Sequence, residues 1–233
     1  MREKSTKSVT CATTLQNNNH QMQTKLIIPD CLLNTRLLDF NKQTTLYHQG
    51  DELNYVWIIN QGFIKIHRLS VQGKQVTLSL LGCNAIFGAA EVDQTLSTET
   101  ASTQSAVRVY RIPIQQFDTL LVNNSDFSQF VARSLFRRKE ALQRRLFCIM
   151  HRKVDARLAS VLTDLARNEG ERCTHGGEID IRLSQQDIAD MVGASRQVVS
   201  TELNRLREQD IVHYSRDLMC IIDLATLALR AEN

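Results

Sequence analysis

The chain has 233 residues, of which 42% are hydrophobic and 23% charged, and its formal net charge is +3. This length favours two modest domains, and the composition is ordinary for a globular protein. A charge this small permits nucleic-acid binding without requiring it. No apolar run reaches the ~20 residues that cross a bilayer, and the N-terminus lacks the apolar stretch of an export signal. We therefore expect a cytoplasmic protein with no membrane partner.

The six cysteines stand far apart and include no Cys-x-x-Cys pair, which argues against a zinc knuckle or a compact disulfide framework. Scattered single thiols in a chain without an export signal are typical of reduced cysteines. Cys148 lies in a long helical pattern, where a lone cysteine is usually a small packed side chain. A thiol switch there would require an exposed sulfur of low pKa.

The first half of the chain divides into a polar tail and a strand-rich unit. Residues 1–24 are rich in Ser, Thr, Asn, Gln and Lys, bury little apolar surface and are expected to be disordered. Residues 25–122 contain short β-rich runs, such as "YVWIINQGFIKIHRLS", separated by turns at glycines. Strands of this length and spacing predict an antiparallel sandwich or roll, and "PIQQFDTLLVNN" predicts a short helix leaving it.

A long helix is expected over residues 123–153, which contain neither Pro nor Gly. Its apolar residues recur at spacings of three, four or seven, so they fall near one stripe. The stripe must cover either the chain's own strand-rich unit or the same helix of a second copy, and periodicity alone does not choose. Its members are Phe127, Val131, Leu135, Leu142, Leu146 and Ile149.

Residues 154–233 read as a compact helical unit with short strands. "VDARLASVLTDLARNEG" predicts an amphipathic helix that stops at Gly170, "GGEIDIRLS" predicts a strand, and "IVHYSRDLMCIID" predicts two β-rich runs around residues 215–217. Between them, Ser184 and Asp187 form the Ser-x-x-Asp start of a helix. Gly193 can adopt the positive φ of a sharp turn, and Ser195 can cap the helix that follows. These signals predict a helix–turn–helix.

The second helix of this motif has two unlike sides. At ~100° per residue, Val199, Leu203 and Leu206 gather on one side, with Val198 beside them. Short polar residues gather on the opposite side, with arginines along the margins. Such a face suits the major groove of DNA, where polar groups meet base edges and arginines reach bases or phosphates. The expected DNA-binding residues are Ser184, Gln185, Ser195, Arg196, Gln197, Ser200, Thr201, Asn204 and Arg205.

The segments "LYHQGDELNYVWIINQGFIKIHRLSVQGKQVTLSLLGCNAIFG" and "LSQQDIADMVGASRQVVSTELNRLREQDIV" resemble the CRP–FNR family of bacterial transcription regulators. The resemblance extends from about residue 37 to residue 223. It implies an α+β chain with a β-roll sensor, a dimerisation helix at residues 123–153 and a winged helix–turn–helix at residues 154–233. It also implies a homodimer on palindromic promoter DNA, with half-sites about one helical turn apart. Activation through contact with RNA polymerase is commoner in the family than repression, and the sequence does not decide between the two.

The sensor departs from the family members that bind cyclic nucleotides. Those members have a glutamate after the glycine that matches Gly88, and an arginine about ten residues further on. Here Ala89 follows Gly88, and no arginine occurs between Gly88 and Arg108. A buried phosphate would therefore lack its charge-assisted partner, so the resemblance implies an effector other than cyclic AMP or cyclic GMP. The expected effector pocket comprises Phe87, Gly88, Ala89, Glu91, Leu142 and Gln143.

No cofactor is predicted. Cys11 and Cys31 are too few and too widely spaced for the iron–sulfur centre of the oxygen-sensing branch. A haem-binding branch needs an axial ligand, for which His48, His67 or Cys83 could be nominated, although each fits an ordinary strand or surface residue. An enzymatic alternative, a cupin-like metal site in the roll, would need clustered His and carboxylate ligands, and the sequence has no His-x-His pair.

The second helix of the helix–turn–helix keeps only part of the Arg-Glu-x-x-x-Arg pattern that cyclic-AMP receptors of the family have at this place. Arg196 is retained and can bind guanine O6 and N7. Gln197 replaces the glutamate and favours adenine, whereas Thr201 replaces the second arginine and could contact a thymine methyl group. We expect a half-site related to, but different from, the family's TGTGA-like element. The leading hypothesis is a homodimeric regulator with an unidentified effector; an effector-independent regulator controlled by its abundance stays open.

Overall fold

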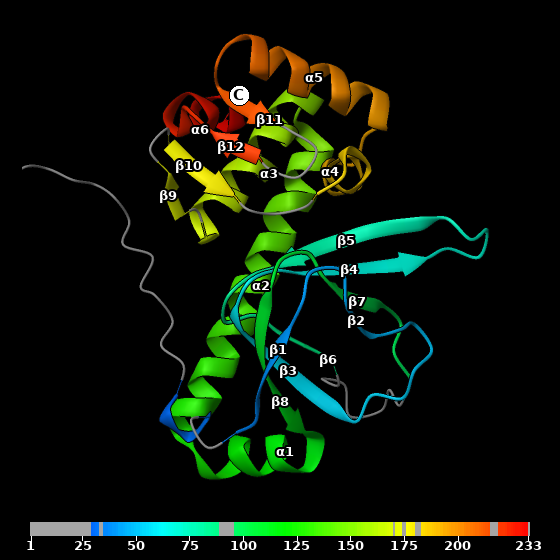
Figure 1. Cartoon of the computed structure of the whole chain (residues 1–233), viewed down its shortest axis with the longest axis vertical. Helices are drawn as coiled ribbons and strands as arrows, with labels where there is room; N and C mark the ends of the chain where they lie inside the picture. The colour runs from blue at the N-terminus through cyan, green and yellow to red at the C-terminus, as the bar shows by residue number, and fades with distance from the viewer. Residues whose placement is uncertain are drawn as a thin grey trace, which may run out of the picture.

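The computed structural model describes residues 29–32, 35–88, 96–169, 171–173, 176–179, 183–214 and 219–232. The tail expected at residues 1–24 therefore lies outside the described residues. Two bodies are joined by a long helix, and Figure 1 shows that helix running from the β-rich body at the bottom to the helical body at the top. The expected α+β fold, with a β-roll and a C-terminal helix–turn–helix domain, is confirmed.

The β-rich body consists of two antiparallel four-stranded sheets, with strand orders β1-β8-β3-β6 and β2-β7-β4-β5. The apolar run of β3 lies between β8 and β6, which explains why its four residues from Val56 to Ile59 are all buried. Strand β5 lies at an edge. The strands are β1 (Leu37–Phe40), β2 (Thr45–Tyr47), β3 (Tyr55–Gln61), β4 (Ile64–Leu69), β5 (Gln75–Leu81), β6 (Ile86–Gly88), β7 (Thr100–Thr103) and β8 (Val107–Pro113).

Two apolar clusters stabilise this roll. One unites Trp57, Phe87 and Tyr47 with aliphatic residues of both sheets. The other joins β3 and β8 to helices α1 (Ile114–Asn123) and α2 (Ser125–His151), and it includes Phe117 and Phe127 at a ring-centroid distance of 5.5 Å. A short 3-10 turn, η1 (Asp30–Leu32), adds the fully buried Leu32. The start of α2 is thereby fixed to the roll.

The C-terminal body begins with α3 (Val154–Glu169), followed by β9 (Glu171–Cys173) and β10 (Gly176–Ile179). Helices α4 (Gln185–Val192) and α5 (Arg196–Glu208) come next, then β11 (Val212–Tyr214), β12 (Met219–Ile221) and α6 (Leu224–Glu232). The strands form one antiparallel sheet in the order β11-β12-β10-β9. The sequence patterns did not anticipate β9 or α6. The turn expected at residues 215–217 lies outside the described residues.

The arrangement of the two bodies determines what each can reach. Figure 1 shows α5 at the end of the molecule that lies away from the roll, while the hairpin of β4 and β5 extends beneath α4. Phe63 of the roll belongs to the same buried cluster as the core of the C-terminal body, and Leu80 packs against that cluster. The two bodies therefore share one apolar contact surface.

Candidate DNA-binding interface

Helix α4 begins with a complete capping box. The Ser184 hydroxyl accepts the backbone N–H of Asp187 at 3.1 Å, and the Asp187 carboxylate accepts the backbone N–H of Ser184 at 3.0 Å. Two N–H groups that a helix start leaves without partners are thus satisfied. On the inner side of α4, Ile188, Ala189 and Val192 are buried, as the pattern predicts.

The turn after α4 depends on Gly193, which has φ +68° and ψ +46°. A Cβ at this position would lie 3.5 Å from its nearest neighbours, Ile149 and Arg157, which is ordinary van der Waals contact. Space is therefore available, and the left-handed backbone conformation is what favours glycine here. Ser195 then caps α5 by accepting the backbone N–H of Val198 at 3.4 Å.

Helix α5 has the two unlike sides that its sequence predicts. Val199, Leu203 and Leu206 are at most 5% exposed and pack into the core. Val198, expected beside them, lies at the margin of the buried stripe and is 43% exposed. On the outer side, Gln197, Thr201 and Asn204 are exposed and Ser200 is half-buried. The Thr201 hydroxyl donates to the Gln197 carbonyl at 3.1 Å, which leaves its methyl group as the free part.

The two arginines nominated on α5 occupy different environments. Arg196 is exposed in the first turn, next to the polar outer face. Arg205 lies 3.8 Å from Glu202 and lines a pocket of about 310 Å³ together with Lys153 and Arg230. Its guanidinium therefore faces the side of α3 and α6 rather than the centre of the outer face, a position that suits a phosphate contact better than base reading.

A tyrosine that the sequence patterns did not single out connects the β11–β12 strand pair to the start of α4. The Tyr214 hydroxyl of β11 donates to the carbonyl of Leu183 at 3.1 Å, one residue before the cap of α4. Burial, together with the negative charge of Asp187, raises the pKa of this phenol, so it remains a neutral donor at neutral pH. Helix α4, the turn at Gly193, helix α5 and the β11–β12 strand pair are thus joined into one unit, here called the reading unit.

Comparisons with known proteins agree with this architecture. Residues 156–230 match the Crp-like helix-turn-helix domain, and residues 37–124 match the cyclic nucleotide-binding domain. The "Global nitrogen regulator" of Nostoc sp. is 28% identical over 192 residues, covering 81% of this chain and 86% of that protein. The "cAMP-activated global transcriptional regulator CRP" of Haemophilus influenzae is 26% identical over 184 residues, covering 78% and 82%.

Among solved structures, a CRP-family transcriptional regulator from Thermus thermophilus has a TM-score of 0.71 and 22% identity, covering 84% of this chain and 97% of that one. The chain belongs to the CRP–FNR family of bacterial transcription regulators. As a member of this family it is a DNA-binding transcription regulator, and α4 with α5 is its helix–turn–helix.

The predicted dimer interface of this CRP–FNR chain is wrong at two residues, Phe127 and Val131. Phe127 and Val131 are 0% and 7% exposed and belong to the cluster that joins α2 to the chain's own roll. The apolar stripe changes partner along the helix: its first two turns pack on α1, β3 and β8, and only its later part leaves the roll. Periodicity identified the apolar side of α2 correctly, but it could not show which residues of that side the roll covers.

The later part of α2 carries the exposed apolar side chains. Leu135, Leu142, Leu146 and Ile149 are between 41% and 59% exposed, and steps of three, four or seven separate them. Three further apolar residues of α2, which the sequence pattern did not single out, are also exposed: Phe136, Phe147 and Met150. Leu135, Leu142 and Ile149 line an open cavity of about 650 Å³ between α2, α3 and the turn before β6.

The residues expected to form the effector pocket do not come together as predicted. Phe87 is 2% exposed and stacks between Tyr47 and Trp57, each at a ring-centroid distance of 6.2 Å. Gly88 has φ +94°, and a Cβ there would lie only 2.7 Å from the Tyr55 carbonyl. Leu142 lines the cavity beside α2 and Gln143 is exposed, whereas neither Phe87 nor Gly88 lines that cavity. Ala89 and Glu91 lie outside the described residues.

The residues considered as haem ligands lie in different environments. His48 is exposed, His67 is half-buried on β4, and the Cys83 thiol donates to the Asn60 carbonyl at 3.1 Å. Across the described ranges, no group of three or more His, Cys, Asp or Glu could hold a metal ion.

Cys148 is 7% exposed, so its thiol is packed as a lone helical cysteine usually is. Within the described part of the chain, no helix is long and apolar enough to span a membrane.

Proposed function

We propose that this regulator acts as a homodimer in which two α5 helices read one palindromic promoter site, with RNA polymerase as its partner in activation. The observation that carries the proposal is the outer face of α5, which is polar, exposed and flanked by Arg196, on a helix whose other side is fully packed. A recognition helix inserts such a face into the major groove, and two-fold symmetry sets half-sites about one helical turn apart.

The second subunit would cover the later part of α2. Leu135, Leu142, Leu146 and Ile149 follow the three-and-four spacing of a coiled-coil seam, and a monomer would leave them in water. Because these side chains are already about half buried in the single chain, covering the rest would contribute roughly half of the about 1.5–3 kcal/mol that complete burial of such a side chain gives. This argument concerns only the exposed part of the helix, because Phe127 and Val131 are already packed within the chain.

For the half-site, we infer that Arg196 binds a guanine through O6 and N7. Gln197 would favour adenine. The methyl group of Thr201 would contact a thymine, since its hydroxyl already donates within the helix. Ser184 and Gln185 at the start of α4, and Arg205 on the flank of α5, would contact phosphates and fix the register without reading sequence.

For the signal, we infer that the effector, where one acts, is not cyclic AMP or cyclic GMP. Ala89 follows Gly88, and no arginine lies between Gly88 and Arg108 to pair with a cyclic phosphate. The resemblance also implies that Leu142 and Gln143 replace the polar Thr-Ser pair with which nucleotide-binding members of the family contact the base. The tight stacking of Phe87 between Tyr47 and Trp57 favours a second candidate, in which the roll is a scaffold and abundance controls the regulator.

A gel-shift titration of purified protein on its own promoter region tests these proposals. We expect specific binding that cyclic AMP and cyclic GMP leave unchanged. Tight binding without any additive favours control by abundance, whereas binding that appears only with a cell extract of small molecules favours an effector. Binding that requires cyclic AMP would overturn the proposal about the signal, and absence of specific binding under all conditions would overturn the function.

A further inference from the structure

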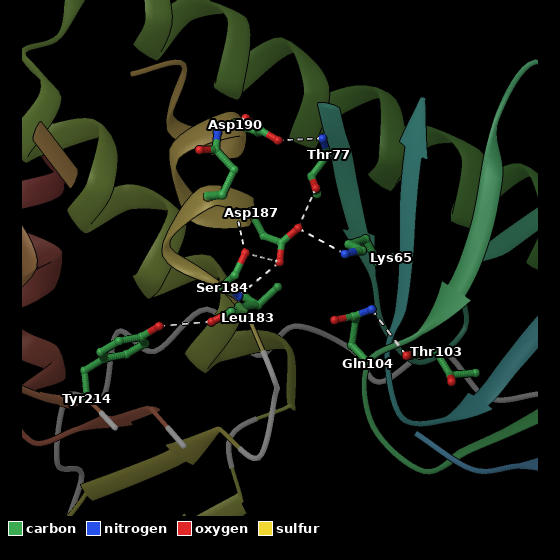
Figure 2. A network of polar contacts seen from close by, with 10 residues as sticks. Lys65, Thr77, Thr103, Gln104, Leu183, Ser184, Asp187, Asp190 and Tyr214 are labelled. Atoms are coloured by element: carbon green, nitrogen blue, oxygen red, sulfur yellow. Dashed lines mark hydrogen bonds and ion pairs between the residues drawn. The ribbon is translucent and has the colours of Figure 1, made fainter. Parts of the chain in front are cut away.

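The start of α4 is held by the sensor as well as by its own cap. Figure 2 shows the Asp187 carboxylate between Ser184 on one side and Lys65 and Thr77 of the roll on the other. Its Oδ1 accepts the Thr77 hydroxyl at 2.7 Å and the Lys65 ammonium at 3.1 Å, while its Oδ2 accepts the Ser184 N–H and hydroxyl. The Lys65 and Asp187 side chains are only 13% and 9% exposed. This pair is therefore built into the contact between the two bodies.

A bulge in β5 makes two further bonds possible. Ile66 faces Ser79 and His67 faces Thr77, so Leu78 is the additional residue of β5. The backbone N–H of Thr77 donates to the Asp190 carboxylate at 2.9 Å, which satisfies an edge-strand donor with a group from α4. The Leu78 carbonyl accepts Arg145 of α2, whose other guanidinium nitrogen donates to the Asp190 carbonyl at 2.9 Å.

Arg145 thus joins three elements: the edge strand of the sensor, the first helix of the reading unit and α2 itself. It lies between Leu142 and Leu146, which carry the exposed apolar surface of α2. Any covering of that surface by a second subunit therefore acts directly beside the residue that connects α2 to α4. Phe63 and Leu80 add an apolar patch to the same junction.

The ion pair between Lys65 and Asp187 also changes the charge near a site where DNA phosphates would lie. In a helix–turn–helix the first helix crosses the DNA backbone, and its positive N-terminal end favours phosphate. A carboxylate in that first turn would repel phosphate unless a cation neutralises it, and Lys65 supplies the cation. In the held orientation the outer face of α5 is exposed, and α5 lies at the end of the molecule away from the roll (Figure 1).

We propose that Lys65 and Thr77 of the sensor are positioning residues for DNA reading: they hold α4, and through it α5, in the orientation that binds DNA, and Arg145 couples this contact to α2. The inference rests on the proposed function. Removal of the contact lets the reading unit adopt other orientations. The apparent affinity for DNA then falls in proportion to the fraction of molecules that keep the DNA-binding orientation. Coupling of this kind typically changes affinity about 5- to 150-fold.

The test uses the full-length protein and the DNA duplex that the unaltered protein selects from a random pool. We expect Lys65→Ala to weaken binding about tenfold and Thr77→Val to weaken it in the same direction, while Lys65→Arg restores binding to within about twofold. Lys74→Ala is the matched control, because Lys74 lies on the same hairpin, is exposed and loses the same charge. It should bind like the unaltered protein. Circular dichroism checks that each variant folds.

Salt dependence separates positioning from direct phosphate contact. Thr77→Val, which alters no charge, should weaken binding at an unchanged slope of log affinity against log salt concentration, whereas loss of a phosphate contact would reduce that slope by about 1. Unchanged or tighter binding by Lys65→Ala, or a reduced slope in Thr77→Val, would overturn the inference and leave the proposed function standing. Failure of the unaltered protein to select any DNA would overturn the proposed function, and the inference with it.

Discussion

Ser184 and Asp187 close the first turn of α4 around each other, with N–H donations of 3.1 Å and 3.0 Å in opposite directions. The same carboxylate then accepts Thr77 and Lys65 from the roll. One short side chain therefore both starts the helix that supports DNA reading and fixes that helix to the sensor. Loss of the serine removes the bond to the Asp187 N–H, whereas loss of the aspartate side chain removes the bond to the Ser184 N–H together with the contact to the sensor.

The helix caps at Ser184 and Ser195 differ in their hydrogen bonds, so their alanine variants should differ in stability. Ser184→Ala should lower the free energy of unfolding by about 1–2 kcal/mol, at the upper end for a helix cap, because Ser184 has short reciprocal bonds. Ser195→Ala should cost less, since its single bond to the Val198 N–H is 3.4 Å long. Urea unfolding of both variants checks the order. Equal losses would show that the capping box adds nothing beyond a single bond.

The pH dependence of stability follows from Asp187. Burial alone raises the pKa of its carboxyl, but hydrogen bonds from Ser184 and Thr77 and the charge of Lys65 outweigh burial and hold that pKa below its ordinary value. The unfolded chain therefore takes up the proton first as pH falls. The stabilisation is complete above the ordinary Asp pKa of about 3.9 and is lost as pH falls through the lower folded value.

The variant Asp187→Asn isolates this contribution. His67 of β4 and Tyr214 of β11 also face the carboxylate, and both remain in the variant. We expect the unaltered protein to be more stable than Asp187→Asn at pH 6, and the difference to shrink below about pH 4. Urea unfolding at a series of pH values measures it. A difference that stays constant from pH 6 to pH 3 would contradict the assigned ionisation.

The two parts of the α2 stripe predict opposite phenotypes. Leu142→Glu should convert dimers to monomers and abolish operator binding with little loss of monomer stability, because its side chain is 49% exposed in the single chain. Phe127→Ala should instead lower the free energy of unfolding by about 3–5 kcal/mol, since Phe127 is fully buried. Sedimentation and urea unfolding distinguish them. Val122→Glu, an exposed position on α1, is the control for added charge.

The arginines of α5 allow a test of base reading. Arg196→Ala should weaken specific binding by about 1–3 kcal/mol and relax the preference at one base position. Arg205→Ala should weaken binding to all sequences alike and reduce the salt slope by about 1, because its guanidinium lies on the flank beside Glu202. Titrations on the selected duplex and on single-base variants measure both. Wild-type affinity and specificity in Arg196→Ala would exclude Arg196 as a base contact.

The elements that sequence predicted well are those specified by neighbouring residues. The capping box, Gly193 and Ser195 fix α4 and α5 through contacts within a few positions, so their pattern was sufficient. The stripe of α2 was predicted only in part, because periodicity tells which side is apolar but not whether Phe127 or Leu142 meets the roll. Lys65 and Asp187 are separated by 122 positions, and neither residue carries a local signal of that pairing.

The effector pocket shows a further limit. Its expected residues are those that the family resemblance implies, whereas the packing of Phe87 against Tyr47 and Trp57 is a property of this chain's own aromatic residues. Resemblance predicts the position of a pocket in the fold, whereas the side chains that fill it determine whether it stays open. The expected half-site depends on resemblance in the same way, through Arg196, Gln197 and Thr201.

Selection of bound duplexes from a random DNA pool tests the central claim most directly, that two copies of α5 read one symmetric site. We predict an inverted repeat whose half-sites lie about one helical turn apart, each with a guanine that Arg196→Ala no longer requires. Recovery of a single unrepeated half-site, or of no common sequence at all, would contradict it.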